Sequence, residues 1–234
     1  MDKINLLTSR NERQRDFQHS LHQNIVTIAT GPAGTGKTLL SLNYGLSGLA
    51  AKNYEKIIYI RPDVSVDHQR GRGALPGEKF EKSLPLLSPL LDNLNIFCQD
   101  GLKKYLLEKE LIEYVYLEDV RGRSLNNVFV CFDEAQNSTI EQFKTILTRI
   151  GSNSTLAILG DPSQVDVSVL KYTNGLQDAI SRLNGLKNLG IIEFKMEDIV
   201  RSPILKHILK RYETPEKDAE ESYTKDMARY IYNS

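Results

Sequence analysis

The 234-residue chain contains no tryptophan, only two cysteines and no long apolar run. Cys98 and Cys131 do not form a metal-binding or redox motif, and Cys131 lies in an apolar stretch where a reduced core thiol is expected. The amino-terminal stretch MDKINLLTSR lacks the apolar core of a signal peptide, and no window approaches the roughly 18 apolar residues typical of a membrane span. We therefore expect a protein of the reducing cytoplasm with no membrane partner.

The chain also lacks net charge. Lys plus Arg number 30 and Asp plus Glu number 30, so no global field attracts the protein to nucleic acid or to a membrane. Tyrosine is plentiful, with 11 residues, but it does not alternate with basic residues in the stripe typical of a base-stacking surface. Any site for a polyanion must therefore be local, and the candidate clusters are Arg70 with Arg72, Arg121 with Arg123, and Lys206 with Lys210 and Arg211.

Apolar stretches alternate along the chain with amphipathic ones. We predict strands over 25–30, 56–61, 114–119, 127–134, 155–161 and 190–196, and helices over 9–23, 37–49, 79–97, 101–110, 138–151, 175–183 and 203–212. Pro85 and Pro89 are expected to break the helix over 79–97. Ser138 and Glu141 fit a capping box at the start of the helix over 138–151, and Gly151 fits its end.

This alternation predicts an α/β domain with a mainly parallel sheet flanked by helices. Residues 62–110 read as a largely helical insertion into that sheet. We expect one domain over residues 1–213, followed by a polar, helical tail over residues 214–234.

The stretch IVTIATGPAGTGKTLLSL, residues 25–42, carries the first chemical motif. It matches G-x-x-x-x-G-K-[ST] in full and stands between an expected strand and an expected helix. Backbone amides of such a loop cradle phosphate groups, Lys37 reaches the β- and γ-oxygens, and Thr38 ligates Mg²⁺. The sequence therefore predicts a site that binds a nucleoside triphosphate. The residues predicted to bind it are Gly31, Pro32, Ala33, Gly34, Thr35, Gly36, Lys37, Thr38 and Leu39.

Two further strands end in polar side chains. VFVCFDEAQN delivers Asp133 to the Mg²⁺ shell and Glu134 to the position of a general base for water, at the sheet edge where ligands of open α/β sheets bind. LAILGDPSQVD presents Gln164, whose amide suits a sensor of the γ-phosphate. The alternative for Gln164 is an ordinary surface turn residue, and for the acids a simple helix start.

The segments GPAGTGKT, VRGRSLNNVFVCFDEAQNST, LTRIGSNS and GDPSQVD resemble the PhoH family of P-loop ATPases, which includes phage-encoded PhoH-like proteins. The resemblance covers roughly residues 10–213. It implies a RecA-like P-loop NTPase domain similar to a single motor core of superfamily-one helicases. It also implies ATP hydrolysis, an association with RNA and, for bacterial members, with phosphate starvation.

Four further residues acquire roles only through this resemblance. Gln14 matches the glutamine that reads the adenine edge, with a surface helix residue as the alternative. Arg201 matches an arginine that contacts the γ-phosphate, within the subunit or across an interface, unless it is an exposed residue at a helix start. Arg121 and Arg123 match the family RGR stretch and are expected to face a phosphate-bearing partner.

The leading hypothesis is an Mg²⁺-dependent ATPase with Lys37, Glu134, Gln164 and Arg201 as catalytic residues, coupled to the remodelling of RNA or another single-stranded nucleic acid. A single phosphate loop and a single acid pair correspond to one lobe of a helicase, so we expect a homo-oligomer, such as a hexameric ring. Two alternatives stay open. One is an ATP-dependent switch or scaffold with slow turnover, and the other is a small-molecule kinase.

Overall fold

The computed structural model describes residues 7–62, 79–166, 174–201, 208 and 211. Its centre is a sheet of six strands in the order β3-β2-β4-β5-β1-β6, and every pairing is parallel. The strands are β1 (Val26–Thr30), β2 (Lys56–Arg61), β3 (Ile112–Tyr116), β4 (Val128–Phe132), β5 (Thr155–Gly160) and β6 (Leu189–Glu193). The predicted α/β fold with a mainly parallel sheet is therefore confirmed.

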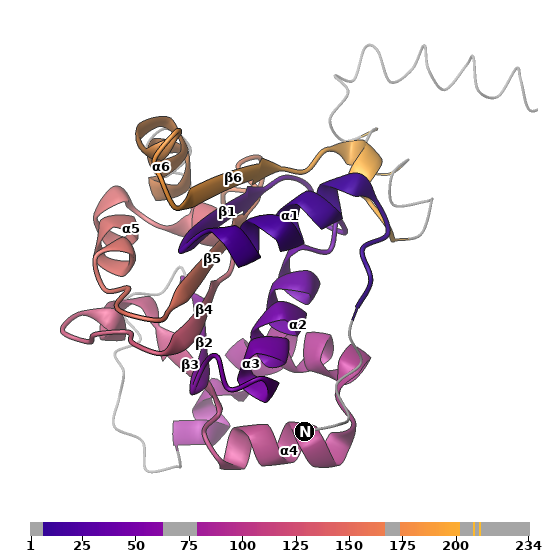
Figure 1. Cartoon of the computed structure of the whole chain (residues 1–234), viewed down its shortest axis with the longest axis vertical. Coiled ribbons are helices and arrows are strands. Elements are labelled where there is room, and N and C mark those ends of the chain that lie inside the picture. The colour runs from indigo at the N-terminus through magenta and orange to yellow at the C-terminus, as the bar shows by residue number, and fades with distance from the viewer. Residues whose placement is uncertain (1–6, 63–78, 167–173, 202–207, 209–210, 212–234) are drawn as a thin grey trace, which may run out of the picture.

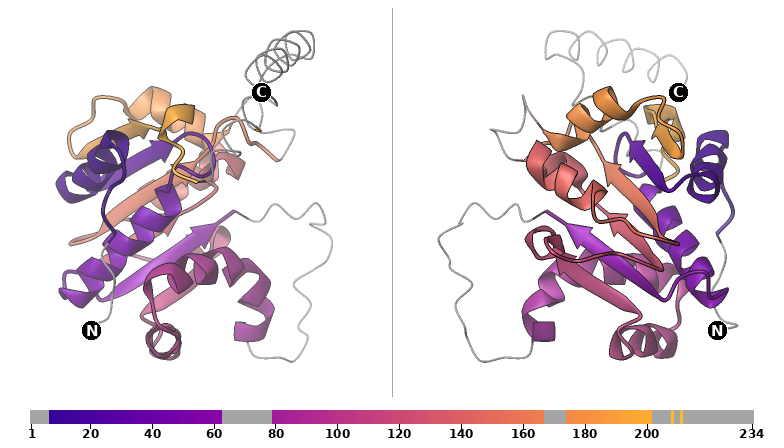
Figure 2. Two further views of the ribbon diagram at one scale, coloured as in Figure 1. Left: turned by 90° about the vertical axis from the view of Figure 1, so that its right-hand side faces the viewer. Right: turned by 60° about the vertical axis from the view of Figure 1, so that its left-hand side comes forward.

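Helices cover both faces of the sheet (Figures 1 and 2). On one face, buried side chains of four helices and the strands share one apolar cluster, and the helices are α1 (Glu12–Gln23), α2 (Lys37–Ala50), α3 (Lys79–Phe97) and α4 (Asp100–Glu108). The other face packs against α5 (Ile140–Leu147) and α6 (Gly175–Leu183). Short 3₁₀ turns complete the chain at Leu117–Val120, Ala135–Asn137 and Met196–Asp198.

The two central strands that carry polar residues at their ends are apolar along their length. Every residue of β4 and β5 is buried, which is typical of strands covered on both faces. All six strands run the same way, so their carboxyl ends meet at one edge of the sheet. The loop after β1, the acids after β4 and the turn after β5 are brought together there.

The start of α5 differs from the prediction by one residue. Its N-cap is Thr139, and the capping box joins Thr139 to Gln142 rather than Ser138 to Glu141. The backbone of Ser138 is engaged elsewhere: its N–H donates to Ala135 and its carbonyl accepts from Gly175. Ser138 therefore closes the preceding 3₁₀ turn, its hydroxyl makes no capping bond, and the helix is capped one residue later by Thr139.

The end of α5 also differs from the prediction. The helix ends at Leu147, capped by Thr148, so Gly151 does not terminate it. Gly151 instead lies against Asn126, where an added Cβ would come within 2.0 Å of the Oδ1 atom. The glycine is explained by this close approach of two loops.

The predicted proline breaks do not occur, because α3 runs without interruption through Pro85 and Pro89. Leu90, Leu94 and Phe97 are buried in the same apolar cluster as α2, and this packing outweighs the hydrogen bonds that the prolines remove. The helical part of the predicted insertion is confirmed by α3 and α4. Segment 63–78, most of the predicted helix over 203–212 and the tail over 214–234 lie outside the described residues.

Within the described part of the chain, no helix is both long and apolar enough to cross a membrane.

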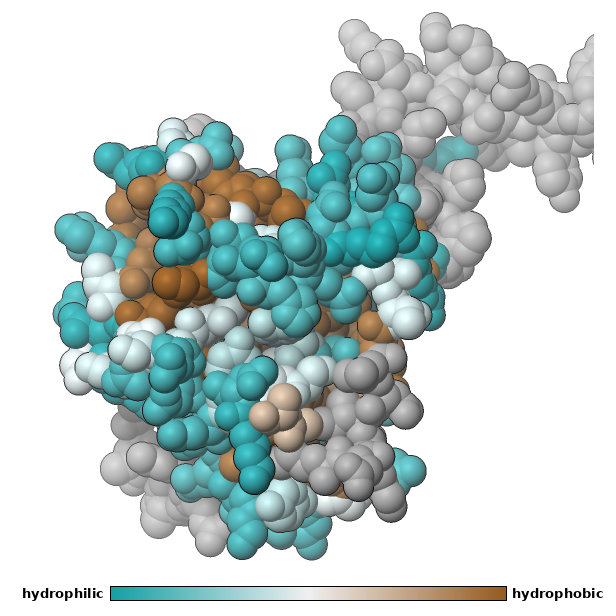
Figure 3. Space-filling view, viewed as in Figure 1, coloured by the Kyte–Doolittle hydropathy of each residue, from teal (hydrophilic) through white to brown (hydrophobic). Residues whose placement is uncertain are grey.

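Apolar side chains gather on one part of the face shown in Figure 3, beside α5, α6 and β6. Ile25 and Leu186, both close to half exposed, are the most open large apolar side chains next to β1 and β6.

Candidate active site

The loop between β1 and α2 is held from outside by the chain that follows β6, the strand at one edge of the sheet. Gly31 has φ +127°, and a Cβ at this position would lie 2.1 Å from the carbonyl oxygen of Phe194. The N–H of Phe194 donates to Thr30, and that of Val200 donates to Gly34. A side chain at Gly31 would therefore force the loop away from the chain that follows β6.

Lys37 is the first residue of α2 and points back into the loop. Its Nζ donates to the carbonyl oxygens of Gly31 at 2.6 Å and Pro32 at 3.0 Å. Burial lowers the pKa of the ammonium, while the carboxylates of Asp161, Asp133 and Glu134 oppose that shift. The ammonium is thus partly desolvated and faces acids, which suits it to exchange loop carbonyls for phosphate oxygens.

Asp133 follows β4 and is joined to α2 and β2. Thr38 donates from Oγ1 to both carboxylate oxygens, at 3.2 Å each, and Tyr59 donates from its hydroxyl to Oδ2 at 2.8 Å. Burial raises the pKa of Asp133, as does the nearby charge of Glu134, whereas the Tyr59 hydrogen bond lowers it. Thr38 and Asp133 are therefore brought together as predicted.

Glu134 has a backbone conformation that is rare for a residue with a side chain. Its φ of 54° and ψ of 36° lie in the left-handed region. Its carboxylate accepts from Gln136 Nε2 at 2.7 Å and lies 3.4 Å from a guanidinium nitrogen of Arg61. Strained backbone of this kind is frequent at functional sites.

Gln136 is a site residue that sequence reasoning missed. It is 1% exposed and connects three parts of the site. Besides Glu134, its Nε2 atom donates to the Gln164 carbonyl at 3.0 Å, and its Oε1 atom accepts from the Asp161 N–H at 3.1 Å. The only sequence signal is its place two residues after the acid pair, which does not reveal these partners.

Gln164 lies in the turn after β5, where its amide donates to Asp161 Oδ2 at 2.7 Å.

Gln14 comes from the opposite side, on α1. Its Nε2 atom donates to the Thr35 carbonyl of the loop, and its Oε1 atom accepts from the Arg10 N–H, both at 2.8 Å. Gln14 is buried and braces the loop directly, so it is not the exposed helix residue of the alternative, and its role in reading adenine stays a prediction.

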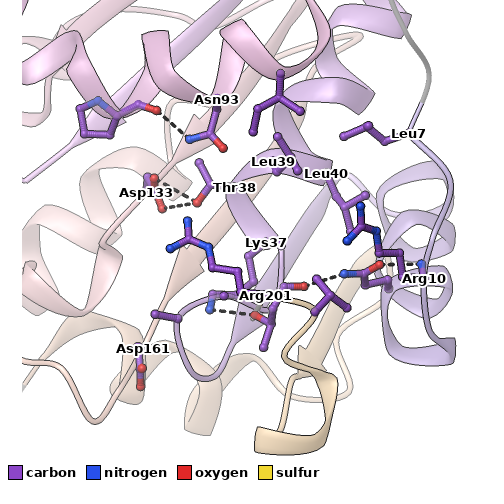
Figure 4. Close-up of a pocket in the computed structure, with 18 of the residues that line it drawn as sticks. Leu7, Arg10, Lys37, Thr38, Leu39, Leu40, Asn93, Asp133, Asp161 and Arg201 are labelled. Carbon is purple, nitrogen blue, oxygen red and sulfur yellow. Dashed lines mark hydrogen bonds between the residues drawn. The ribbon is translucent and has the colours of Figure 1, made fainter. Parts of the chain in front are cut away.

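A cavity of about 480 Å³ opens over these residues (Figure 4). This volume falls within the usual range of about 300–1,000 Å³ for ligand pockets. One side of the cavity is lined by α3 through Pro89, Asn93 and Ile96. Of the residues predicted for the site, the lining contains Gln14, Ala33, Gly34, Thr35, Gly36, Lys37, Thr38, Leu39, Asp133, Glu134, Gln164 and Arg201, while Gly31 and Pro32 contribute through the carbonyl bonds to Lys37.

The predicted basic clusters are only partly described. Arg123 makes two ion-paired hydrogen bonds with Glu113, at 3.1 and 3.3 Å, so its charge is balanced within the domain. Arg121 and Arg211 are exposed. The remaining cluster residues, Arg70, Arg72, Lys206 and Lys210, lie outside the described residues.

The donor set fits a hard divalent cation. Thr38 and Asp133 supply a hydroxyl and a buried carboxylate, and oxygen ligands of this kind suit Mg²⁺. Among the described residues no cluster of three or more acidic, His or Cys side chains could form a complete cage. A cation at this position would therefore take most of its ligands from phosphate oxygens and water.

The chain is similar in sequence to known proteins over most of its length. The chain is 36% identical over 200 residues to a PhoH-like protein of Bacillus subtilis and 35% identical over 208 residues to Protein PhoH of Escherichia coli K12. These alignments cover 86% and 88% of this chain but 62% and 58% of those proteins, so the chain spans about three fifths of their length.

The fold is similar to that of the large terminase of a thermophilic bacteriophage, a structure solved in complex with ADP. The TM-score is 0.50 at 14% identity, and the match covers 88% of this chain and 50% of the terminase chain. The family model described as "PhoH-like protein" matches residues 6–213. The chain therefore belongs to the PhoH-like family.

Proposed function

We propose that the protein binds and hydrolyses ATP in an Mg²⁺-dependent manner, and that hydrolysis is coupled to the remodelling of RNA or another single-stranded nucleic acid. One observation carries the first half of this proposal. Lys37, Thr38, Asp133 and Glu134, from two separate segments of the chain, line one cavity at the carboxyl edge of the sheet. Membership of the PhoH-like family supports the same assignment.

The residues divide the proposed reaction between them. Lys37 leaves the carbonyls of Gly31 and Pro32 for the β- and γ-oxygens, and loop amides and the α2 amino terminus hold the remaining charge. Thr38 and Asp133 would hold Mg²⁺, which would neutralise charge on the phosphates. Glu134 orients a water molecule and accepts its proton as the water oxygen attacks the γ-phosphorus and ADP leaves.

Gln164 and Arg201 are proposed to contact the γ-phosphate. Gln164 loses this contact when phosphate departs, because its amide then returns to Asp161. Arg201 lines the cavity of its own chain and adds positive charge as the γ-phosphoryl group transfers. Gln14 and the neighbouring Arg10 lie at the far end of the cavity, where we place the adenine base.

The nucleic-acid half of the proposal rests on family membership and on exposed arginines such as Arg121. The relatives that carry the family name are longer than this chain. The coupling of ATP hydrolysis to nucleic acid is therefore proposed for this chain and not taken over from those relatives. The competing hypothesis is a nucleotide-dependent switch that binds a protein partner and hydrolyses ATP slowly. The two hypotheses predict different results when Glu134 is replaced by glutamine.

The test measures phosphate release with and without Mg²⁺, and with single-stranded RNA, single-stranded DNA or a duplex. Lys37→Ala should abolish productive ATP binding. Glu134→Gln should keep ATP binding and lose turnover by about two orders of magnitude or more, the range for a general base. We expect one polynucleotide to stimulate the wild-type rate. Turnover unchanged in Lys37→Ala would reject the site. A Glu134→Gln protein that loses turnover but keeps its partner-binding activity would favour the switch.

A further inference from the structure

The carboxyl end of β2 places a second cation, Arg61, beside the acid pair. Strands β2 and β4 are still hydrogen-bonded at this level, because the Asp133 N–H donates to the Ile60 carbonyl at 2.9 Å. Arg61 is the last residue of β2 and Glu134 follows Asp133, so the strand register sets these two side chains next to each other. A guanidinium nitrogen of Arg61 lies 3.4 Å from Glu134 Oε1.

The Glu134 carboxylate is engaged at both oxygens. Arg61 contacts Oε1, and Gln136 donates to Oε2 at 2.7 Å. In this arrangement the Glu134 carboxylate is held between two partners, so it is not free to turn toward an attacking water.

The contact to Arg61 is the weaker of the two and is open to solvent. Side-chain exposure is 29% for Arg61 and 40% for Glu134, and ion pairs this exposed contribute little to stability. The contact to Gln136, by contrast, is made by an amide that is buried and fixed by Asp161 and Gln164. An outside anion can therefore remove Arg61 while Gln136 keeps the Glu134 carboxylate in place.

We propose that Arg61 is a latch that restrains Glu134, and that the phosphate backbone of a bound single-stranded polynucleotide releases it by taking over the guanidinium. A planar guanidinium matches a phosphate group with two parallel hydrogen bonds, which favours this exchange. The inference rests on the proposed function, because Glu134 acts on water there. It assigns Arg61 as a positioning residue that couples the polynucleotide to hydrolysis.

The experiment compares Arg61→Gln and Arg61→Lys with wild type for kcat and KM of ATP hydrolysis, with and without single-stranded RNA. The control is Lys56→Gln. Lys56 lies at the other end of β2 and pairs with Glu113 at 3.0 Å, with closely similar exposure. Thermal unfolding of each variant verifies that it is folded.

Removing the latch should raise the basal kcat of Arg61→Gln about two- to fivefold, the range that an exposed ion pair can supply, with KM unchanged. Stimulation by RNA should fall by the same factor, Arg61→Lys should be intermediate, and Lys56→Gln should behave as wild type.

A basal kcat at or below the wild-type value in folded Arg61→Gln would overturn the latch while the proposed function stands. RNA stimulation that persists in full would overturn the release step. A wild-type chain without turnover would overturn the proposed function and the latch with it.

Discussion

At the scale of single residues, the phosphate loop is braced from two sides before any ligand enters. Gln14 bonds to the carbonyl of Thr35 from α1, and the Val200 N–H bonds to Gly34 from the chain after β6. The amides that would cradle phosphate are therefore positioned by residues distant in sequence. This preorganisation lowers the entropy that binding must supply.

Replacing Gln14 by alanine tests its two predicted contributions separately. Loss of the bond to Thr35 should weaken binding of inorganic triphosphate, and loss of base reading should weaken ATP further. We expect the Kd for ATP to rise about five- to tenfold, since one lost hydrogen bond costs about 1 kcal/mol. Calorimetric titration with both ligands measures this, and Gln23→Ala, at the exposed end of α1, is the matched control. Equal losses for the two ligands would remove the base-reading role.

Residue spacing in the sequence was sufficient to find Lys37, Thr38, Asp133 and Glu134, because a motif and a run of buried strand residues place them. Tyr59 and Gln136 could not be found in this way. Tyr59 reaches Asp133 only because β2 lies beside β4, and Gln136 reaches Asp161 only because β4 lies beside β5. Such partners depend on strand order, which local sequence does not encode.

At the scale of elements, α2 packs very closely against the centre of the sheet. Gly45 faces Phe129 of β4, and a Cβ at Gly45 would lie 2.4 Å from the Phe129 ring. The absence of a side chain allows the helix to approach the strand that leads to the acid pair. Sequence patterns predicted that both elements exist but not that they touch at this point.

Gly45→Ala should destabilise the protein by about 1–3 kcal/mol, because overpacking outweighs the gain in helix propensity. Denaturant unfolding measures the change. The control is Gly101→Ala in α4, where an added Cβ meets no atom within 4 Å, and this variant should be neutral or up to about 1 kcal/mol more stable. A Gly45→Ala protein as stable as Gly101→Ala would show that the contact is not tight in solution.

The ends of the elements were less predictable than their cores. Ser138 and Thr139 are both acceptable N-caps, and Ser138 is instead used by the preceding 3₁₀ turn, through Ala135, and by a tertiary bond from the Gly175 N–H. The prolines of α3 likewise break an isolated helix more readily than one whose apolar face is buried. In each case packing, which depends on the whole chain, overrides a local preference.

At the scale of the whole molecule, the cavity is lined by the carboxyl edge of the sheet with its loops, by one side of α3, and by α1 with the residues just before it. A helicase closes ATP between two motor lobes, and the family resemblance assigns only one lobe to this domain. We predict that Mg²⁺ and ATP drive self-assembly into a closed oligomer such as a hexameric ring. Subunit contacts would then complete the surroundings of the nucleotide.

Light scattering or sedimentation with and without Mg²⁺ and ATP tests this assembly. We expect a shift from monomer to a single larger species when Mg²⁺ and ATP are added. In Glu134→Gln the larger species should persist, because the bound ATP is not hydrolysed. A protein that stays monomeric while hydrolysing ATP at the normal rate would contradict the prediction. Because Arg201 lines the cavity of its own chain, mixing Lys37→Ala with Arg201→Ala subunits should not restore turnover.

The contact of the loop with the chain after β6 has a consequence for how this fold can be divided. Gly31 rests on Phe194, and the Val200 N–H donates to the Gly34 carbonyl, so the chain that follows β6 forms the outer wall of the loop. A fragment that stops before β6 would retain the whole motif in its sequence and yet lack that wall. Proteolytic removal of the last strand would thus inactivate a motif that lies more than 150 residues earlier in the chain.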